Sequence, residues 1–236
     1  MSFSHLLFDF DHMLFDTDSS EALAFARALV QSGIDKPERY LPQYQSINQR
    51  LWRQVEAGTI SPNDVKTLRF ELLKTELGLN YNSAAVAENY ITGLVECGEL
   101  FPGARRLLED LEANFSLGMI TNGIGPVQRG RMERLGLRRF FDSVVISGEV
   151  GVAKPRPEIF ALALAELGDP PRSNCLMIGD SLPSDIQGGQ NAGIPTAWFN
   201  PKGTANFTSL EPTFEFANFD RLVDVLGDSA WGNHRK

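Results

Sequence analysis

Hydrophobic positions along this chain follow two different patterns, one before and one after residue 98. Within residues 17–97 the apolar side chains recur at helical spacing, as Val65, Leu68 and Leu72 do, and no run has the alternation of a strand. From residue 98 onward, short apolar runs alternate with helical segments. The first half therefore predicts a helical block, and the second half predicts alternating strands and helices.

Capping residues divide the helical block. Asp18 and Glu21 have the spacing of a capping box, and Gly33 is expected to end the helix that they start. A second helix is expected to start at Ser61, because a proline and an acidic residue follow it within one turn. A third helix is predicted over residues 84–97.

The strands and helices of the second half predict a parallel sheet. Strands are expected at residues 4–10, 116–121, 143–146, 175–179 and 196–199. Helices are expected at residues 104–111, 126–135, 157–167 and 184–191. Such alternation favours a Rossmann-like, three-layer α/β core whose parallel sheet is covered on both faces. Because the strand at residues 4–10 must join that sheet, residues 1–16 and 98–236 are predicted to form the core domain, and residues 17–97 an inserted helical domain.

Composition and charge narrow the possible partners. The chain has 236 residues, and its 42% apolar and 22% charged residues are ordinary for a globular protein. A net charge of −8 and a pI near 5.0 argue against nucleic acid as a partner, which would require a basic surface. An anionic small molecule is not excluded, because a bound cation and one lysine can reverse the sign of the potential locally.

Nothing in the sequence indicates a membrane or an oxidising compartment. Cys97 and Cys175 lack the spacing of a metal or redox site, and both are expected in the core. The first residues contain no basic targeting region, and every apolar run is shorter than the roughly 20 residues of a bilayer span. We therefore expect a cytoplasmic protein, as a monomer or a homodimer.

Polar residues follow four of the predicted strands. Ligands of open parallel sheets bind beyond the carboxyl ends of the strands, so these residues are the candidates for a site. They are Asp9 and Asp11, then Thr121, Asn122 and Gly123, then Lys154, and finally Asp180 and Asp185.

The first two carboxylates suit cleavage of a phosphoester through a covalent intermediate. Asp9 and Asp11 are two residues apart, so they point to the same side in an extended chain. Neighbouring carboxylates have different proton affinities, which lets one act as the nucleophile while the other carries a proton for the leaving group. The alternative is that both acids simply cap the following turn.

Asp180 and Asp185 predict a magnesium site together with Asp9. Mg²⁺ prefers oxygen ligands, commonly one or two carboxylates with water and substrate phosphate. Asp180 leaves its strand beside Asp9, and Asp185 could hold a bound water. The alternative for Asp185 is an acid that the helix dipole favours at a helix N-terminus.

The remaining polar groups could bind a phosphoryl group. The Thr121 hydroxyl, the backbone N–H groups around Asn122 and Gly123, and the Lys154 ammonium are the donors and cation that phosphoryl transfer requires. Alone, Thr121 could be a plain strand end and Lys154 a surface lysine. Together with the carboxylates they favour phosphate chemistry.

In this order the segments resemble the four motifs of the haloacid dehalogenase superfamily. They are Asp9-Phe10-Asp11, Thr121-Asn122-Gly123, Lys154-Pro155 and Gly179-Asp180-Ser181-Leu182-Pro183-Ser184-Asp185. The second half is similar to the YjjG-type pyrimidine nucleotidases, notably over residues 146–155, 184–193 and 198–201.

The resemblance implies a role for each residue. Asp9 would be the nucleophile and a magnesium ligand, and Asp11 the general acid and base, with its backbone carbonyl on the metal. Lys154 would bind the phosphoryl group with Thr121 and Asn122, and would temper the charge on Asp9. Asp180 would bind magnesium with help from Asp185, and the inserted helices would form a cap over the site.

The resemblance favours a phosphatase, because the superfamily's dehalogenases lack the second aspartate, here Asp11. One departure follows that residue: His12 and Met13 stand where the family has a small residue and then a threonine or a β-branched residue. Met13 lacks the hydroxyl that would help to fix this turn. The loss of this hydroxyl is either tolerated, or it reduces the activity or alters the substrate.

The function expected is a magnesium-dependent phosphatase acting through an aspartyl-phosphate on nucleoside 5′-monophosphates. Alternatives are a phosphatase for sugar phosphates or other small metabolites, and a binding module without turnover. Phe15, Trp52 and Tyr90 could stack on a base, although aromatic residues of helical segments are more often core.

Overall fold

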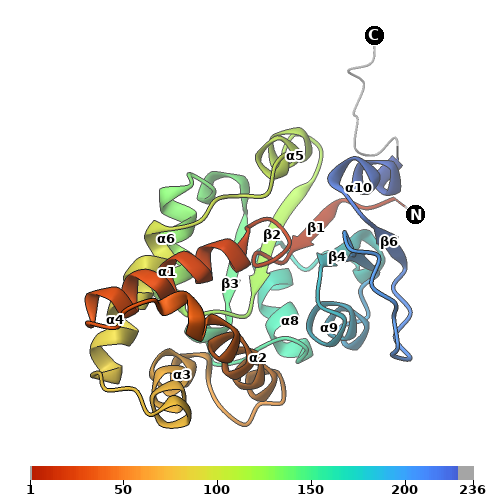
Figure 1. Ribbon diagram of the computed structural model, residues 1–236. Helices are drawn as coiled ribbons and strands as arrows, with labels where there is room; N and C mark the ends of the chain where they lie inside the picture. The colour runs from red at the N-terminus through yellow and green to blue at the C-terminus, as the bar shows by residue number, and fades with distance from the viewer. Residues whose placement is uncertain (1, 228–236) are drawn as a thin grey trace.

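The computed structural model describes residues 2–227, and its centre is one parallel sheet (Figure 1). The strand order is β3-β2-β1-β4-β5-β6, and every neighbouring pair is parallel. The strands are β1 (His5–Phe8), β2 (Ser116–Thr121), β3 (Ser143–Ile146), β4 (Cys175–Gly179), β5 (Thr196–Phe199) and β6 (Phe214–Phe216). The chain builds the sheet outward from β1 in one direction and from β4 in the other. The order therefore reverses between β1 and β4, where such sheets bind ligands.

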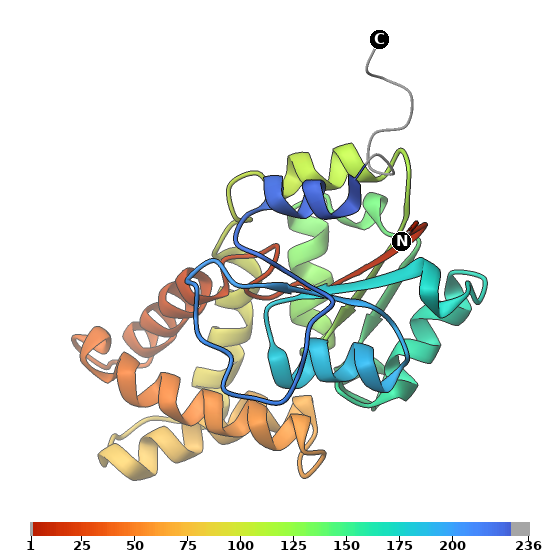
Figure 2. The same cartoon turned by 90° about the vertical axis from the view of Figure 1, so that its right-hand side faces the viewer.

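Helices cover both faces of this sheet. On one side lie α5 (Ala104–Leu111) and α10 (Phe219–Leu226), and on the other lie α8 (Pro157–Glu166) and α9 (Gln187–Asn191) (Figure 2). The remaining helices after β2 are α6 (Gly125–Arg134) and the short α7 (Ser147–Val150). This arrangement confirms the expected three-layer α/β core.

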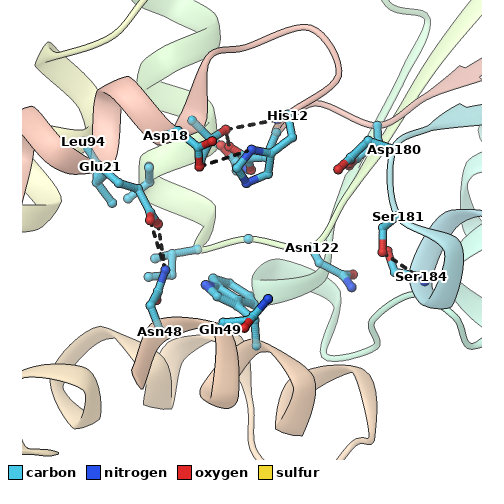
Figure 3. A pocket seen from close by; sticks show the side chains of 18 of the residues that line it. His12, Asp18, Glu21, Asn48, Gln49, Leu94, Asn122, Asp180, Ser181 and Ser184 are labelled. Carbon is cyan, nitrogen blue, oxygen red and sulfur yellow. Dashed lines mark hydrogen bonds and ion pairs between the residues drawn. The ribbon is translucent and has the colours of Figure 1, made fainter. Parts of the chain in front are cut away.

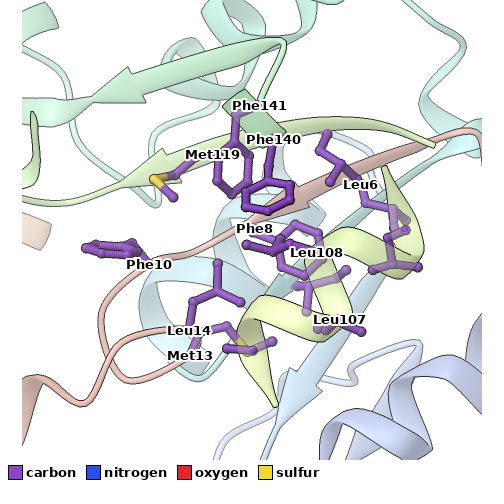
Figure 4. Close-up of a cluster of buried hydrophobic side chains, with 14 of the residues drawn as sticks. Leu6, Phe8, Phe10, Met13, Leu14, Leu107, Leu108, Met119, Phe140 and Phe141 are labelled. Atoms are coloured by element: carbon purple, nitrogen blue, oxygen red, sulfur yellow. The ribbon is translucent and has the colours of Figure 1, made fainter. Parts of the chain in front are cut away.

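The side chains of β1 divide between the two cores. Leu6 and Phe8 pack into a cluster with α5, shown in Figure 4, whereas Leu7 packs into a second cluster with α8. All three side chains are fully buried. Because successive residues of a strand point to opposite faces, an unbroken apolar run such as this one is what a strand buried on both faces requires.

The helical block follows β1 and has a core of its own. It contains α1 (Thr17–Gln31), α2 (Leu41–Glu56), α3 (Pro62–Leu77) and α4 (Ser83–Glu96), which lie together beside the sheet (Figures 1 and 2). Their cluster includes Phe25, Tyr44, Phe70 and Tyr90, and it rests on Val127 of α6. The helices therefore pack on one another and on the start of α6.

Several expected boundaries are confirmed, and one cap is not. The strands at residues 116–121, 143–146, 175–179 and 196–199 agree with the structure, while the first strand is shorter than residues 4–10. Ser61 does cap α3 in a capping box with Asp64. The capping box predicted for α1 is wrong, because Asp16 rather than Asp18 accepts the N–H of Ser19.

Other elements were not foreseen as separate units. They are α2, α7, β6 and α10. The helix expected at residues 184–191 starts as a π-helical turn, Leu182–Ile186, and continues as α9. Within residues 2–227, no helix is both long and apolar enough to cross a membrane.

Candidate active site

The polar residues that follow the strands meet at the reversal point of the sheet. Phe8 of β1 is in register with Ile178 of β4, so Asp9 and Asp180 leave neighbouring strands at nearly the same level. A cavity of about 550 Å³ opens there between the sheet and α1, α2 and α6 (Figure 3). Asp9, Asp180 and Lys154 line it.

Three carboxylates form a compact group at the sheet end of this cavity. One oxygen each of Asp9, Asp180 and Asp185 lies within 4.8 Å of the others. Asp185 is completely buried and accepts the N–H of Ser181 at 3.0 Å. A side chain at Gly179 would stand 2.2 Å from Asp185 Oδ2, so this carboxylate occupies its place only because residue 179 is glycine.

Lys154 is the cation of the group. Its Nζ lies 2.6 Å from Asp9 Oδ1 and 2.7 Å from Asp185 Oδ1, and the side chain is only 1% exposed. The lysine reaches this position from the loop before α8, where the Lys154–Pro155 peptide is cis. It is therefore a buried bridge between two carboxylates and not a surface lysine.

Asn122 holds the backbone of Lys154. Its side-chain Oδ1 accepts the N–H of Lys154 at 2.9 Å, and its Nδ2 donates to the carbonyl of Lys154 at 2.9 Å. The N–H of Gly123 donates to Ser147 Oγ at 3.0 Å. The Asn122 side chain thus positions the lysine, and the Gly123 N–H has an acceptor within the protein, while the binding of phosphate by Asn122 stays a prediction.

Burial and crowding shift the proton affinities of this group. Burial raises the pKa of Asp9 well above its usual range, although Lys154 acts to lower it. Burial, followed by the charge of Asp185, raises the pKa of Asp180 to about 8. Burial opposes the ammonium of Lys154, but Asp185 and Asp9 outweigh it and raise the pKa of the lysine.

This charge balance fits a divalent cation. Three carboxylates face one ammonium, so the protein alone leaves an excess of negative charge in a buried place. The donor set is oxygen only, which is the set that Mg²⁺ prefers. Asp9 and Asp180 face the cavity and would hold such an ion. Asp185 is buried behind them and would assist as the third carboxylate.

Asp11 lies apart from these three carboxylates. It accepts hydrogen bonds from Thr17 Oγ1 at 2.7 Å and from Gln128 Nε2, and its Oδ1 pairs with Arg131 Nη1 at 2.9 Å. Thr121 is fully buried, and its hydroxyl accepts from Gln128 Nε2 at 3.0 Å, while its role in phosphate binding stays a prediction. The Asp11 carboxylate is thus held at the cavity wall by three donors.

Comparison with known proteins agrees with this geometry. Residues 3–193 match the profile of the haloacid dehalogenase-like hydrolases. The chain belongs to that family.

Individual relatives cover nearly the whole chain. Pyrimidine 5′-nucleotidase YjjG of Escherichia coli is 36% identical over 96% of this chain and 99% of its own length. Pyrimidine 5′-nucleotidase PynA of Streptococcus pneumoniae is 35% identical over 96% of each chain. The crystal structure of the HAD-hydrolase YfnB of Bacillus subtilis, solved with magnesium, has a TM-score of 0.88 at 34% identity, covering 96% of this chain and 100% of that one.

The departure from the family's first motif has a structural counterpart. Met13 is fully buried in the core cluster with Phe10 and Leu14 (Figure 4), so its apolar side chain has a packing role. The hydroxyl that Met13 lacks is present on Thr17, whose Oγ1 accepts the N–H of His12 at 3.2 Å and donates to Asp11. His12 itself is exposed and adopts a positive φ of 59°.

Several cavity residues were missed from the sequence. Gln128 and Arg131 lie three residues apart on α6 and are 1% and 3% exposed. Glu21 of α1 and Asn48 of α2 face one another across the far wall of the cavity (Figure 3). A polar residue at a position that helical periodicity assigns to the core was the available signal.

Proposed function

We propose that this protein is a magnesium-dependent phosphatase that hydrolyses nucleoside 5′-monophosphates through an aspartyl-phosphate at Asp9. The observation that carries the proposal is the position of Lys154 Nζ, 2.6 Å from Asp9 and 2.7 Å from Asp185, next to the Asp9–Asp180–Asp185 group. A nucleophilic carboxylate, a metal site and a phosphate-binding cation share one end of the cavity.

In the first step, a carboxylate oxygen of Asp9 forms a bond to phosphorus and the ester P–O bond breaks. The protonated carboxyl group of Asp11 gives its proton to the departing alkoxide and becomes the carboxylate that pairs with Arg131. Magnesium bound by Asp9, Asp180 and the Asp11 carbonyl would supply positive charge to the phosphoryl oxygens. Lys154 supplies a second positive charge to the phosphoryl group and favours the ionised form of Asp9.

In the second step, water attacks the phosphorus of the aspartyl-phosphate, and the bond to Asp9 breaks. The Asp11 carboxylate takes the proton of that water, which restores both carboxyl groups and releases inorganic phosphate. Thr17, Gln128 and Arg131 hold the Asp11 carboxylate in place between the two steps. Asn122 acts through Lys154 as a positioning residue.

A nucleotide is the substrate that the relatives and the cavity favour. Two relatives that match nearly the whole chain are named pyrimidine 5′-nucleotidases. The cavity volume of about 550 Å³ is ample for a phosphate, a ribose and a base. The far wall is lined by polar side chains of α1 and α2, such as Glu21, Asn48 and Gln49, and by Trp52.

We further propose that residues 17–97 form a cap domain on a core of residues 1–16 and 98–236. The separate hydrophobic cluster of α1–α4 supports this division. Because α1 and α2 line the cavity opposite the carboxylates, movement of the cap would open and close it. A cytoplasmic location and a monomeric or homodimeric state remain predictions.

A substrate panel tests the proposal. Nucleoside monophosphates, sugar phosphates and para-nitrophenyl phosphate are assayed for release of inorganic phosphate, with Mg²⁺ and with a chelator. We expect turnover only with the metal, and the highest kcat/KM with a nucleotide. A preference for sugar phosphates would indicate a metabolite phosphatase instead, and binding without any turnover would indicate a binding module.

Substitution of the nucleophile separates chemistry from binding. Asp9→Asn is expected to abolish turnover, whereas the same change at exposed Asp35 should have no effect. Full activity of purified Asp9→Asn would refute the mechanism.

A further inference from the structure

One arginine of the helical block is buried without a carboxylate beside it. Arg69 of α3 is 1% exposed, and it takes part in none of the ion pairs formed within residues 2–227. Arginine is rarely buried this deeply unless its charge is paired. The ring of Tyr90, whose centroid lies 5.2 Å from Arg69 Cζ, offsets part of the cost of burial. What remains to be matched is the hydrogen-bonding capacity of the guanidinium.

Two of the three guanidinium nitrogens have acceptors in the protein, and one does not. Nε donates to the carbonyl of Val65 at 2.9 Å, and Nη1 donates to the hydroxyl of Tyr44 at 3.0 Å. Nη2 makes no hydrogen bond with the described part of the chain. Protein does not cover it either, because the one covered and unpaired side-chain nitrogen or oxygen between residues 2 and 227 is Asn48 Oδ1. Since Arg69 lines the cavity, the N–H groups of Nη2 open into it.

The two bonds to the protein fix the plane of the guanidinium. Nη2 is therefore held in place before any ligand arrives, and it offers a ligand only donors. The matching ligand group is an oxygen or nitrogen that accepts a hydrogen bond.

The charges around Arg69 favour a neutral acceptor over a second anion. Glu21 lines the cavity on the wall opposite Asp180 (Figure 3). Burial raises the pKa of Glu21, and the charge of Arg69 is the strongest influence that acts to lower it. The two side chains thus affect one another without forming an ion pair. A phosphate or carboxylate bound at Nη2 would be repelled by the Glu21 carboxylate, whereas a carbonyl oxygen would not.

The order of residues along α2 shows which part of a nucleotide would meet Arg69. Tyr44, which holds Arg69, is near the start of this helix, and Glu56 is its last residue. The pKa of Glu56 is raised by burial and then by the charge of Asp185, so the end at Glu56 is the one near the carboxylates. With the phosphate bound at the carboxylates, the base would point toward Arg69.

An aromatic side chain lies between these two ends of α2. Trp52 is two turns after Tyr44 and one turn before Glu56 on the same side of the helix, is half-buried, and lines the cavity. An indole at this place can stack on a planar base, whose carbonyl edge then reaches Nη2. A sugar phosphate has no planar group to occupy this position.

We infer that Arg69 is a specificity-determining residue whose Nη2 donates a hydrogen bond to a carbonyl oxygen of the nucleobase. This inference rests on the proposed nucleotidase function and assigns a base-binding contact within it. A base of the same shape without a carbonyl oxygen would leave Nη2 unpaired in the complex.

The test combines a change in the substrate with a change in the protein. Thymidine 5′-monophosphate is compared with its difluorotoluene isostere, in which fluorine replaces both carbonyl oxygens and carbon replaces the ring nitrogens. Values of kcat/KM are measured for the wild type, Arg69→Met and Arg53→Met. Arg53 is an exposed arginine of α2 outside the cavity and serves as the matched control. Fructose 1,6-bisphosphate, which carries a second anion and no base, is the third substrate.

We expect the wild type and Arg53→Met to use the isostere roughly 10- to 100-fold less efficiently than the nucleotide. Arg69→Met should reduce this ratio to within about threefold by losing activity on the nucleotide, while its kcat/KM for the isostere stays within threefold of the wild type. Turnover of the isostere therefore also shows that the variant is folded.

Three results would overturn the inference. They are equal use of both nucleotides by the wild type, an unchanged ratio in Arg69→Met, and a wild-type preference for the bisphosphate that Arg69→Met abolishes. The last result would assign Arg69 to a second anion. If Arg69→Met does not fold, Arg69→Lys, which keeps a buried cation on a shorter side chain, is measured instead, and a ratio that does not fall at least threefold there would reject the contact.

Failure of the proposed function has a different signature. If the wild type releases no phosphate from any substrate, the phosphatase assignment falls. The inference is then decided by the affinities of the wild type and Arg69→Met for thymidine 5′-monophosphate and its isostere, measured by calorimetry. Equal affinities in the wild type would reject Arg69 as a base-binding residue, and weaker binding of the isostere that disappears in Arg69→Met would support it.

Discussion

Replacing Lys154 by methionine should affect both stability and catalysis, because its ammonium serves two buried carboxylates. The methionine side chain is similar in length and apolar, so it fills the space without the charge. Lys154 Nζ pairs with Asp9 and Asp185, and all three side chains are at most 10% exposed. The variant thus leaves carboxylates buried without their cation.

The expected loss of stability follows from breaking a buried ion pair. Removal of one partner costs about 3–5 kcal/mol, and the low end applies here because raised pKa values allow a carboxyl to take up a proton instead. For a chain of this length, 1 kcal/mol corresponds to about 2–4 °C in Tm, so about 3 kcal/mol lowers Tm by about 6–12 °C. The measurement is thermal unfolding in chelator at pH 8, with exposed Lys202→Met as the matched control.

Magnesium should restore part of this stability. A ligand that binds only the folded state stabilises it by about 2.7 kcal/mol when its concentration is 100 times Kd. Because the ammonium no longer repels the metal, the rise of Tm with Mg²⁺ should be larger in Lys154→Met than in the wild type. Activity should nevertheless fall by about 10²–10³ in kcat, since a charge that stabilises the transition state is lost. A variant with wild-type Tm in chelator and activity within threefold would refute this account of Lys154.

Three further predictions concern the support of the same group. Asn122→Ala should lower kcat by about tenfold with little change in KM, because the amide that holds the backbone of Lys154 is lost; steady-state kinetics checks this. Gly179→Ala should lower magnesium affinity, measured by calorimetry, because the new methyl group would stand 2.2 Å from Asp185 Oδ2 and displace it. The raised pKa of Asp180, about 8, means that folding takes up a proton, so the Tm of the metal-free protein should fall as the pH rises from about 4 to about 8. The same titration with Mg²⁺ should be flatter, and a metal-free Tm that rises with pH over this window would contradict the assignment.

Much of the core could be predicted because its signals are local. The run at residues 143–146 is apolar throughout and forms β3 with those bounds, since a strand buried on both faces needs an apolar side chain at every position. Ser61 and Asp64 cap α3 through bonds within one turn, so their order in the chain suffices. The N-cap of α1 is Asp16 and not the predicted Asp18. Both aspartates could cap a helix, and the path of the chain that leads into α1 determines which of them does.

The candidate catalytic residues were accessible from the sequence for a topological reason. In a parallel sheet every strand ends at the same edge, so residues after different strands converge wherever they stand in the chain. Asp9 and Asp180 are therefore neighbours once β1 pairs with β4. Identifying the strands in the sequence was therefore enough to predict that Asp9 and Asp180 lie close together.

The supporting contacts were decided by the tertiary structure. Asn122 holds the backbone of Lys154 across 32 residues, and Arg131 pairs with Asp11 across 120. Glu21 and Asn48 meet only because α1 and α2 face the same cavity. The apolar spacing of a helix is a property of neighbouring residues and can be read along the chain. The partner of a buried polar side chain depends instead on which elements the fold brings together, since the sequence around Asn122 contains nothing that specifies Lys154.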